Sequence, residues 1–166
     1  MFQAPANLPV RPTTDYAKSA LFNILTNRID FTECNVLDLF AGIGGISLEF
    51  ASRGAKSIIS VDSHAPCLKF IRETSEKLGI KNLETIRSDV FKYLKSCDRK
   101  FDLIFADAPF EMTETDQIPE LVFSQNLLKD DGILIVEHQS KRILQSSHTP
   151  EVRTYGNCAF SFFKAI

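Results

Sequence analysis

The stretch Val36-Leu37-Asp38-Leu39-Phe40-Ala41-Gly42-Ile43-Gly44-Gly45-Ile46-Ser47-Leu48-Glu49 decides the expected fold of this 166-residue chain. An apolar run with one carboxylate, Asp38, leads directly into a glycine-rich turn and then into an amphipathic helix. Nucleotide-binding α/β domains begin with such a strand, loop and helix, because the glycines let a ligand approach the backbone closely. The stretch therefore predicts a doubly wound α/β domain with a nucleotide-type ligand.

The carboxylate of Asp38 favours one ligand over the others. At the mouth of a pyrophosphate site it would repel the phosphates, whereas it suits the sulfonium and ammonium groups of S-adenosylmethionine (SAM). The chain lacks the Gly-Lys-Ser/Thr signature of a P-loop, and its loop runs Gly42-x-Gly44-x-x-Ser47. We therefore expect SAM as the cofactor and a SAM-dependent methyltransferase as the function, with an NAD-dependent oxidoreductase the least favoured interpretation.

Alternating strand and helix patterns extend this unit along the whole chain. Helices are expected from 13–15 to about Asn27 and at 45–53, 66–78, 90–95 and 114–128, the last with a break near Pro119. Strands are expected at 35–40, 57–61, 83–87, 101–106 and 132–136, followed by an antiparallel hairpin of 152–155 and 159–164 around Gly156-Asn157.

This order of elements predicts the Rossmann-like α/β fold of class I SAM methyltransferases. We expect a mostly parallel seven-stranded sheet with an antiparallel C-terminal strand, preceded by an N-terminal helix. Residues 1–166 are expected to form one domain, with an extended segment and the first helix in residues 1–28.

Composition and charge narrow the class of protein further. Hydrophobic residues make up 44% of the chain and charged residues 24%, as in ordinary globular domains. The formal net charge of −2 gives no overall basic footprint, but 1–30 and 138–166 both carry an excess of Lys and Arg, so RNA contacts would come from the flanks. Because no membrane span, signal peptide or clustered Cys and His residues are found, we expect a cytoplasmic monomer without metal or membrane contact.

Polar residues that follow successive strands form the predicted cofactor site. In doubly wound sheets the ligand lies across the carboxyl ends of the strands. Asp38 and the loop glycines are expected to hold the amino-acid part of SAM, and Asp62, 24 residues further on, to accept its ribose hydroxyls. Asp89 is expected either to contact the adenine amine or only to cap the helix that follows it. The predicted cofactor-binding set is Asp38, Phe40, Ala41, Gly42, Gly44, Asp62, Ser63, Asp89 and Val90.

The tetrapeptide Asp107-Ala108-Pro109-Phe110 follows the fourth strand and predicts a methyl-acceptor site. An exocyclic base amine is a poor nucleophile, because its lone pair is delocalised into the ring. The Asp107 carboxylate and the Ala108 carbonyl can accept its two hydrogens and so aim the lone pair at the methyl group. Pro109 would fix the turn, and Phe110 would stack on a flipped-out base. The alternative interpretation is an ordinary strand-ending turn with a core phenylalanine.

These residues resemble the RsmD family of 16S ribosomal RNA guanine-N2 methyltransferases over essentially the whole chain. Val10-Arg11-Pro12-Thr13-Thr14-Asp15 and Ser19-Ala20-Leu21-Phe22-Asn23-Ile24-Leu25 are similar to that family's Arg-Pro-Thr-x-Asp helix. The SAM loop is also similar to the family's, and Asp107-Ala108-Pro109-Phe110 matches its Asp-Pro-Pro-Phe/Tyr pattern except at Ala108. The resemblance implies a guanine of 16S rRNA, in the assembling small ribosomal subunit, as the substrate. It also implies substrate- or SAM-ordering roles for Arg11, Thr13, Thr14 and Lys18.

The chain departs from the family pattern at its N-terminus, and alternative acceptors stay open. Tyr16 and Lys18 stand where the family usually has arginines, and the family's basic β-hairpin would precede Met1-Phe2-Gln3. Either the coding start lies further upstream or this version lacks that RNA-binding element. An adenine-N6 or protein-glutamine methyltransferase would use a similar tetrapeptide, although Asp at position 107 favours rRNA. A non-catalytic SAM-fold binding module is the interpretation from another class.

Overall fold

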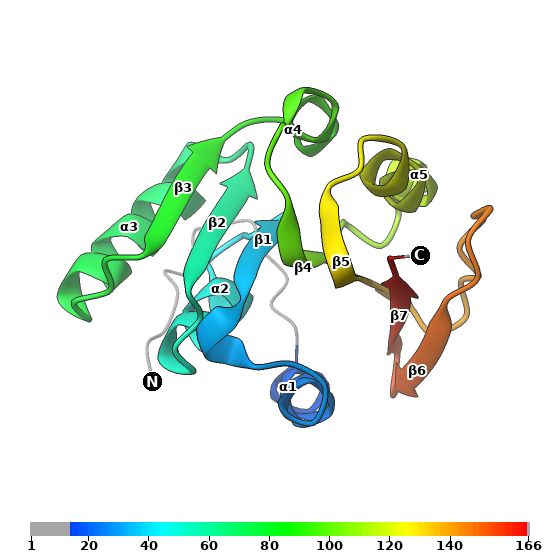
Figure 1. Cartoon of the computed structure of the whole chain (residues 1–166), viewed down its shortest axis with the longest axis horizontal. Helices are drawn as coiled ribbons and strands as arrows, with labels where there is room; N and C mark the ends of the chain where they lie inside the picture. The colour runs from blue at the N-terminus through cyan, green and yellow to red at the C-terminus, as the bar shows by residue number, and fades with distance from the viewer. Residues whose placement is uncertain (1–13, 166) are drawn as a thin grey trace.

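The parallel strands predicted from the sequence lie side by side in one sheet. Within residues 14–165, the part of the chain that the computed structural model describes, seven strands follow the order β3-β2-β1-β4-β5-β7-β6 (Figure 1). The strands are β1 (Asn35–Leu39), β2 (Ser57–Asp62), β3 (Leu83–Arg87), β4 (Phe101–Ala106), β5 (Leu128–Gln139), β6 (Glu151–Tyr155) and β7 (Cys158–Lys164). The first five are parallel, and β7 pairs antiparallel with both β5 and β6. The predicted fold class is therefore confirmed, and the strand order reverses between β1 and β4.

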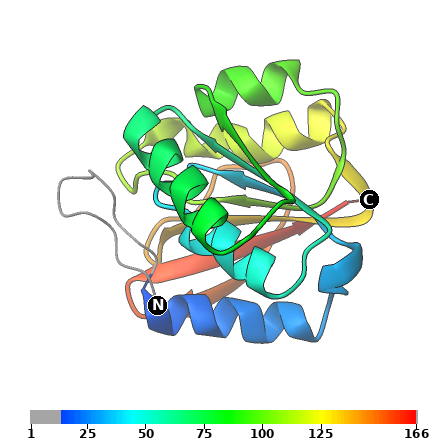
Figure 2. The same cartoon turned by 90° about the vertical axis from the view of Figure 1, so that its left-hand side faces the viewer.

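Helices cover both faces of this sheet. They are α1 (Asp15–Thr26), α2 (Gly45–Ser52), α3 (Ala65–Lys77), α4 (Val90–Ser96) and α5 (Gln117–Ser124), with the short 3-10 turns η1 (Phe31–Glu33) and η2 (Thr113–Asp116). Helices α1, α2 and α3 lie on one face, and α4 and α5 on the other (Figures 1 and 2). A three-layer arrangement follows, as expected when βαβ units alternate along a chain.

Alternating side chains of the strands supply one core on each face. Val36 of β1 belongs to the cluster under α1 and α2, whereas Leu37 and Leu39 belong to the cluster under α4 and α5. Phe22 of α1 meets Phe50 of α2 edge to face, with ring centroids 4.8 Å apart. Because β1 is buried on both faces, its sequence reads as a nearly continuous apolar run, as central parallel strands do.

The region after β4 differs from the sequence expectation. The predicted helix at 114–128 is instead the turn η2 followed by α5, which ends at Ser124. No break occurs at Pro119, because it lies in the first turn of α5, where the backbone N–H groups have no helical partner. Strand β5 is longer than the predicted 132–136, since its pairing with β4 shifts register between Leu128 and Ile133. Gly132 permits this bulge, because a Cβ there would lie 2.8 Å from the Lys129 carbonyl oxygen.

Candidate active site

The carboxyl ends of β1, β2, β3 and β4 meet at one edge of the sheet. Leu39 is paired with Val61 of β2 on one side and with Ala106 of β4 on the other. Asp62 is paired with Arg87 of β3. The loops that follow these four strands therefore emerge next to one another, beside the point where the strand order reverses, which is where doubly wound sheets bind ligands.

The loop after β1 combines left-handed backbone conformations with a close approach to α3. Gly42 has φ +56° and Gly44 has φ +86°, a region that glycine occupies at little cost. A Cβ on Gly44 would also lie 2.8 Å from Cγ1 of Ile71 in α3. Gly44 is therefore required both for the turn and for the packing of α3. Phe40, with φ +58°, turns toward α4, where its ring meets that of Phe91 at 6.3 Å.

Asp62 ties this loop to the start of α3. Its Oδ2 accepts a hydrogen bond from the Gly42 N–H at 2.9 Å, and its Oδ1 accepts one from the His64 N–H at 2.8 Å. The carboxylate is half-buried, and each oxygen has a further lone pair that could accept a ribose hydroxyl. Asp62 thus orders the backbone of the predicted cofactor loop, and its contact with the ribose stays a prediction. Ser63 is exposed beside it.

Asp38 lies beneath the loop rather than on its surface. Its side chain is 1% exposed, and its Oδ2 accepts a hydrogen bond of 2.5 Å from the Ser47 hydroxyl in α2. Ser47 is in turn 2.6 Å from the Ser60 hydroxyl of β2. Burial, helped by the charge of the nearby Asp62, raises the pKa of Asp38 to about 7. A cation bound at the loop would favour the ionised form of Asp38.

Ser47 and Ser60 were not singled out in the sequence. Both hydroxyls are buried, and they link the first strand, its helix and the second strand through one carboxylate. The available signal is a serine at position 60 inside the apolar run of β2, where a buried hydroxyl needs a partner.

Asp89 caps the helix that follows β3. Its Oδ1 accepts a hydrogen bond from the Lys92 N–H at 3.0 Å, and the side chain is exposed. The next residue, Val90, is buried in the core under α4 and α5. The structure therefore supports the capping role, and contact with adenine stays a prediction.

The predicted acceptor tetrapeptide crosses the sheet edge immediately beside the β1 loop. The Asp107 N–H donates to the Leu39 carbonyl oxygen at 3.4 Å. Ala108 is buried in the core under α4 and α5, whereas half-buried Phe110 packs against the cluster under α1 and α2. Pro109 is exposed between them, and its carbonyl oxygen accepts a hydrogen bond from the Met112 N–H at 3.0 Å. The turn is thus anchored to the core on both sides.

Arg142, which follows β5, holds the segment after the tetrapeptide. Its Nη1 donates to the Met112 carbonyl oxygen at 2.8 Å, and its Nη2 lies 3.3 Å from both the Thr113 carbonyl oxygen and Asp116 Oδ1. The Met112 backbone therefore connects Arg142 to Pro109 through two successive hydrogen bonds. Sequence reasoning missed Arg142, since nothing but its position just after a strand marks it.

The end of β5 contributes a buried imidazole. His138 Nε2 lies 2.8 Å from the Ser161 hydroxyl of β7, and Nδ1 lies 2.8 Å from the Gln139 carbonyl oxygen. Burial lowers the pKa of His138, which favours the neutral ring. Nε2 thus links β5 to β7, while Nδ1 is engaged within β5, and this residue supports the sheet next to β4.

The N-terminal residues predicted to bind substrate are only partly within the described structure. Arg11 and Thr13 lie outside the described residues. Thr14 caps α1, where its Oγ1 accepts a hydrogen bond from the Ala17 N–H at 3.2 Å. Lys18 lies one turn further along, and its Nζ is 3.8 Å from Glu49 of α2.

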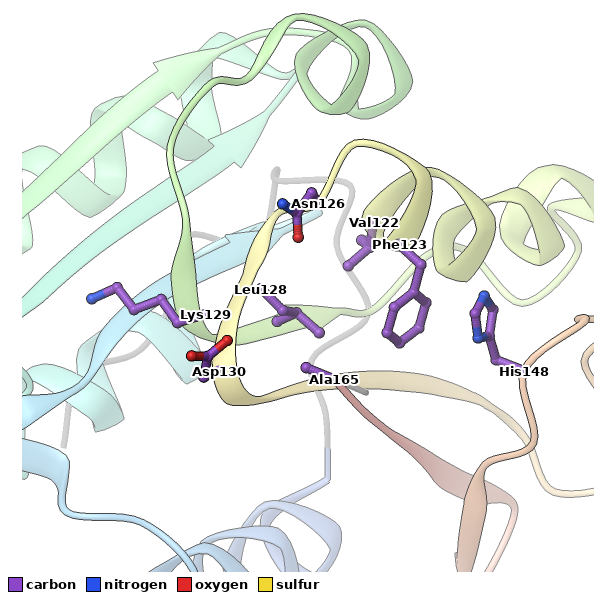
Figure 3. Close-up of a pocket in the computed structure, with 8 residues that line it drawn as sticks. All are labelled: Val122, Phe123, Asn126, Leu128, Lys129, Asp130, His148 and Ala165. Atoms are coloured by element: carbon purple, nitrogen blue, oxygen red, sulfur yellow. The ribbon is translucent and has the colours of Figure 1, made fainter.

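A separate hollow of about 280 Å³ lies at the opposite end of the sheet, where β5 begins and β7 finishes. Its lining includes Leu128 at the start of β5 and Ala165 just after β7 (Figure 3). The rings of Phe123 and His148 stack on one side of it, with centroids 4.0 Å apart. None of the predicted site residues lines this hollow.

Residues 14–165 contain neither a metal-binding cluster nor a membrane-spanning helix. In that part of the chain no three His, Cys, Asp or Glu side chains lie close enough together to hold a metal ion. None of the helices described there is long and apolar enough to cross a membrane.

Comparison with known proteins gives a consistent family and fold. A family model described as Conserved hypothetical protein 95 matches residues 1–164. The ribosomal RNA small subunit methyltransferase D of Buchnera aphidicola subsp. Baizongia pistaciae is 33% identical over 132 residues, which cover 79% of this chain and 66% of that protein. The Escherichia coli protein of the same name is 30% identical over 135 residues, covering 81% and 67%. The chain thus spans about two thirds of the length of these relatives.

Solved structures share the fold. A hypothetical protein of Thermus thermophilus superposes with a TM-score of 0.85 at 23% identity, covering 99% of this chain and 93% of that one. An RNA methyltransferase from Salinibacter ruber, solved with S-adenosyl-L-homocysteine, gives a TM-score of 0.70 at 14% identity, covering 93% of both chains. At these identities the likeness establishes the SAM methyltransferase fold and nothing finer.

Proposed function

The chain belongs to the Conserved hypothetical protein 95 family, and from that premise we propose that it transfers a methyl group from SAM to N2 of a guanine in small-subunit ribosomal RNA. One observation carries the proposal: the tetrapeptide Asp107-Ala108-Pro109-Phe110 is hydrogen-bonded to the end of β1, directly beside the glycine loop. A loop suited to a cationic nucleotide and a pair of oxygen acceptors for an amine therefore lie side by side. The names of the relatives support methyl transfer to rRNA.

The residues around the β1 loop fit SAM. Asp62 places a carboxylate beside the loop, and Asp38 beneath the loop would be favoured in its ionised form by a bound cation, which suits a ligand carrying two positive groups. Gly42 and Gly44 keep side chains away from the backbone that the ligand would contact. In this arrangement Asp62 accepts ribose hydroxyls, and the N-terminal end of α2 receives the SAM carboxylate. When bound, SAM supplies an activated methyl group on a sulfonium.

The acceptor side positions the nitrogen and receives its charge. The Asp107 carboxylate and the Ala108 carbonyl accept the two hydrogens of the guanine amine, so that its lone pair points toward the methyl group. As the nitrogen–carbon bond forms and the sulfur–carbon bond breaks, the nitrogen becomes positive and gives up one proton, which Asp107 can accept. Phe110, held against the core, offers an aromatic ring to the guanine. Catalysis then depends on position and electrostatics without a covalent enzyme intermediate.

The direct test measures transfer of a labelled methyl group from SAM to small ribosomal subunits that lack the modification. The modified nucleoside is then identified by mass spectrometry. N2-methylguanosine is the expected product, whereas N6-methyladenosine or methylglutamine would reassign the acceptor. Absence of transfer by a chain that still binds SAM would instead favour the non-catalytic binding module.

We further propose that the guanine is presented by the assembled or partly assembled particle. With a formal net charge of −2 the chain has no overall basic footprint, so shape and neighbouring contacts must contribute to recognition. Comparing naked 16S rRNA with small-subunit particles in the same assay tests this. Faster transfer to particles is expected, and equal transfer to naked rRNA would contradict it.

A further inference from the structure

A pair of tyrosines, Tyr16 exposed and Tyr155 half-buried, joins the two ends of the described chain. Tyr16, in the first turn of α1, is 68% exposed. Its ring meets that of Tyr155, the last residue of β6, edge to face, with centroids 5.9 Å apart and planes 78° apart. Tyr155 fixes the place of Tyr16 while leaving most of its ring in solvent.

The pair lies at the same end of the sheet as the acceptor tetrapeptide, the end at which the parallel strands finish. Tyr155 is paired with Cys158 of β7, which is paired with Gln139 of β5. Gln139 lies three residues beyond Val136, the partner of Ala106 in β4. Tyr155 therefore lies at the level of the loops that leave the carboxyl ends of the parallel strands.

A chain of aromatic contacts connects this pair to β4. Tyr155 meets Phe160 with ring centroids 6.0 Å apart, and Phe160 meets Phe105 at 6.3 Å. Phe105 lies two residues before Asp107 in the sequence. Because Phe105 and Phe160 are fully buried, the tyrosine pair is attached through the core to the strand that carries the acceptor site.

Positive charge accompanies the pair along β6. Arg28, just after α1, donates to the Glu151 carboxylate at 3.0 Å, and Arg153 donates to the same carboxylate at 2.8 Å. Two guanidinium groups thus share one carboxylate. Arg153 is two residues from Tyr155 on the same side of β6, so the surplus positive charge lies next to the aromatic pair.

A second group of two cationic side chains and one carboxylate lies on the other side of α1. Lys18 and Arg53 both approach the Glu49 carboxylate, at 3.8 and 3.0 Å. Helix α1 is therefore flanked by two clusters that each carry one uncompensated positive charge, on a chain whose formal net charge is −2.

We propose that the α1–β6 surface, formed by Tyr16, Tyr155, Arg28 and Arg153, binds an unpaired nucleotide of the RNA next to the target guanine. The Tyr16 ring stacks on a base, and Arg153 contacts a phosphate beside it. Arg28, beyond the other end of α1, lies further along the same surface and keeps Glu151 paired. An exposed aromatic ring flanked by surplus cations is how proteins bind unpaired nucleic acid with little sequence preference. The inference rests on the proposed function for the identity of the target, and on the geometry of α1 and β6 for the surface itself.

Tyrosine fluorescence offers a direct binding assay. The chain has three tyrosines and no tryptophan, and the third, Tyr93, lies on α4 on the other face of the sheet. A short unstructured RNA with a single guanine is titrated into the full chain, and stacking is expected to quench the emission. Tyr16→Ala should weaken binding of this RNA about tenfold, within the range that base stacking on an aromatic side chain contributes. Tyr16→Phe keeps the ring and should bind like the wild type in an assay with labelled RNA.

Val152→Ala supplies the matched control. Val152 is 51% exposed on the same strand as Tyr155, and because side chains alternate along a strand it lies on the opposite face of β6 from Arg153 and Tyr155. This variant should bind RNA as the wild type does. Arg153→Gln should weaken binding less than Tyr16→Ala, and it should reduce the dependence of affinity on salt concentration.

Kinetics on small-subunit particles separate this proposal from the proposed function. Tyr16→Ala should raise KM for the particle about tenfold and leave kcat and SAM affinity unchanged. Wild-type affinity of Tyr16→Ala for RNA, or an absence of RNA binding by the wild type, would overturn the surface. If the wild type binds RNA with quenching but transfers no methyl group, the surface stands and the proposed function fails.

Discussion

The proposed cofactor half and the proposed acceptor half of the candidate site are held in different ways. The cofactor half, loop 40–44 with Asp38 and Asp62, is joined by hydrogen bonds between residues 9 and 20 positions apart. The acceptor half, residues 107–116, is held by Arg142 from 26 to 30 positions away. A cofactor loop can therefore be specified within one βαβ unit, whereas an acceptor loop is positioned by the rest of the fold.

Removal of the Asp107 carboxylate should have the largest effect and should leave the cofactor half intact. We expect Asp107→Ala to lower kcat by about 10³-fold, as the loss of charge stabilisation and of a proton acceptor implies. SAM affinity, measured by titration calorimetry, should stay within a few-fold of the wild type. Glu111→Ala, an exposed carboxylate in the same loop, is the control and should keep full activity. A large loss of SAM affinity in Asp107→Ala would show that Asp107 also supports SAM binding, and would contradict the division of the site into two halves.

Asp62→Ala should act on the other half. The variant loses the acceptor of the Gly42 and His64 N–H groups and the proposed ribose contact, and charge-assisted hydrogen bonds of this kind contribute about 1.5–3 kcal/mol each. We expect SAM affinity to fall about a hundredfold, with residual transfer at saturating SAM. Asp62→Asn, which keeps one acceptor oxygen, should lie between. Unchanged SAM affinity in Asp62→Ala would exclude the ribose role.

Arg142→Gln tests whether the acceptor loop is positioned from a distance. Without the guanidinium, Met112, Thr113 and Asp116 lose their shared donor, and the turn at Pro109 is held less firmly. We expect kcat to fall about tenfold with SAM affinity unchanged, because small displacements of reacting groups are costly. Hydrogen exchange of the Met112 amide should accelerate in the same variant. The exposed neighbour Lys141→Gln serves as the control, and equal kcat in both variants would remove Arg142 from the acceptor half.

The smallest expected effect on SAM binding or methyl transfer comes from Asp38, whose main effect is on the pH dependence of folding stability. Its pKa is raised by burial to about 7 in the folded chain, so the folded state keeps a proton that the unfolded state releases near its ordinary value of 3.8. The stability that Asp38 contributes is therefore complete at low pH and is lost as the pH rises toward 7. Compared with Asp38→Asn, the wild-type free energy of unfolding should fall between about pH 4 and about pH 7. Urea unfolding of both proteins across this range measures it, and a constant difference would contradict the buried protonated state.

SAM should reverse this trend, since its positive groups favour the ionised carboxylate. We expect wild-type SAM affinity to decrease a few-fold as the pH falls below about 7, and Asp38→Asn to lose that dependence. If the SAM affinities of the two proteins changed with pH in the same way, ionisation of Asp38 would not be coupled to SAM binding.

Local sequence was sufficient to predict much of the cofactor half. The strand, the glycine turn and the helix around Asp38 are consecutive, and Asp62 marks the end of β2. The periodicity of apolar residues and the positions of the turn residues therefore locate these elements. The burial of Asp38 was not predictable, because it depends on Ser47 and Ser60 meeting across two elements. The same is true of Gly44, whose need for space comes from Ile71 of α3.

The acceptor half could be recognised but not assembled from sequence. The tetrapeptide after β4 is readable as a motif, yet its anchors in both cores and at Arg142 arise only when β5 and its following segment are in place. The longer β5 and the shorter α5 were also missed, since the bulge at Gly132 depends on pairing with Phe101 and Leu103 of β4. Contacts such as Tyr16 with Tyr155 join opposite ends of the chain and leave no local pattern.

A crystal structure of the chain with S-adenosyl-L-homocysteine would test the central claim most directly. The account predicts the ribose on Asp62, the amino-acid part over Gly42 and Gly44, and the sulfur facing the tetrapeptide at Asp107. A ligand bound elsewhere, such as in the hollow beside Phe123 and His148, or one whose sulfur faces away from Asp107, would contradict it.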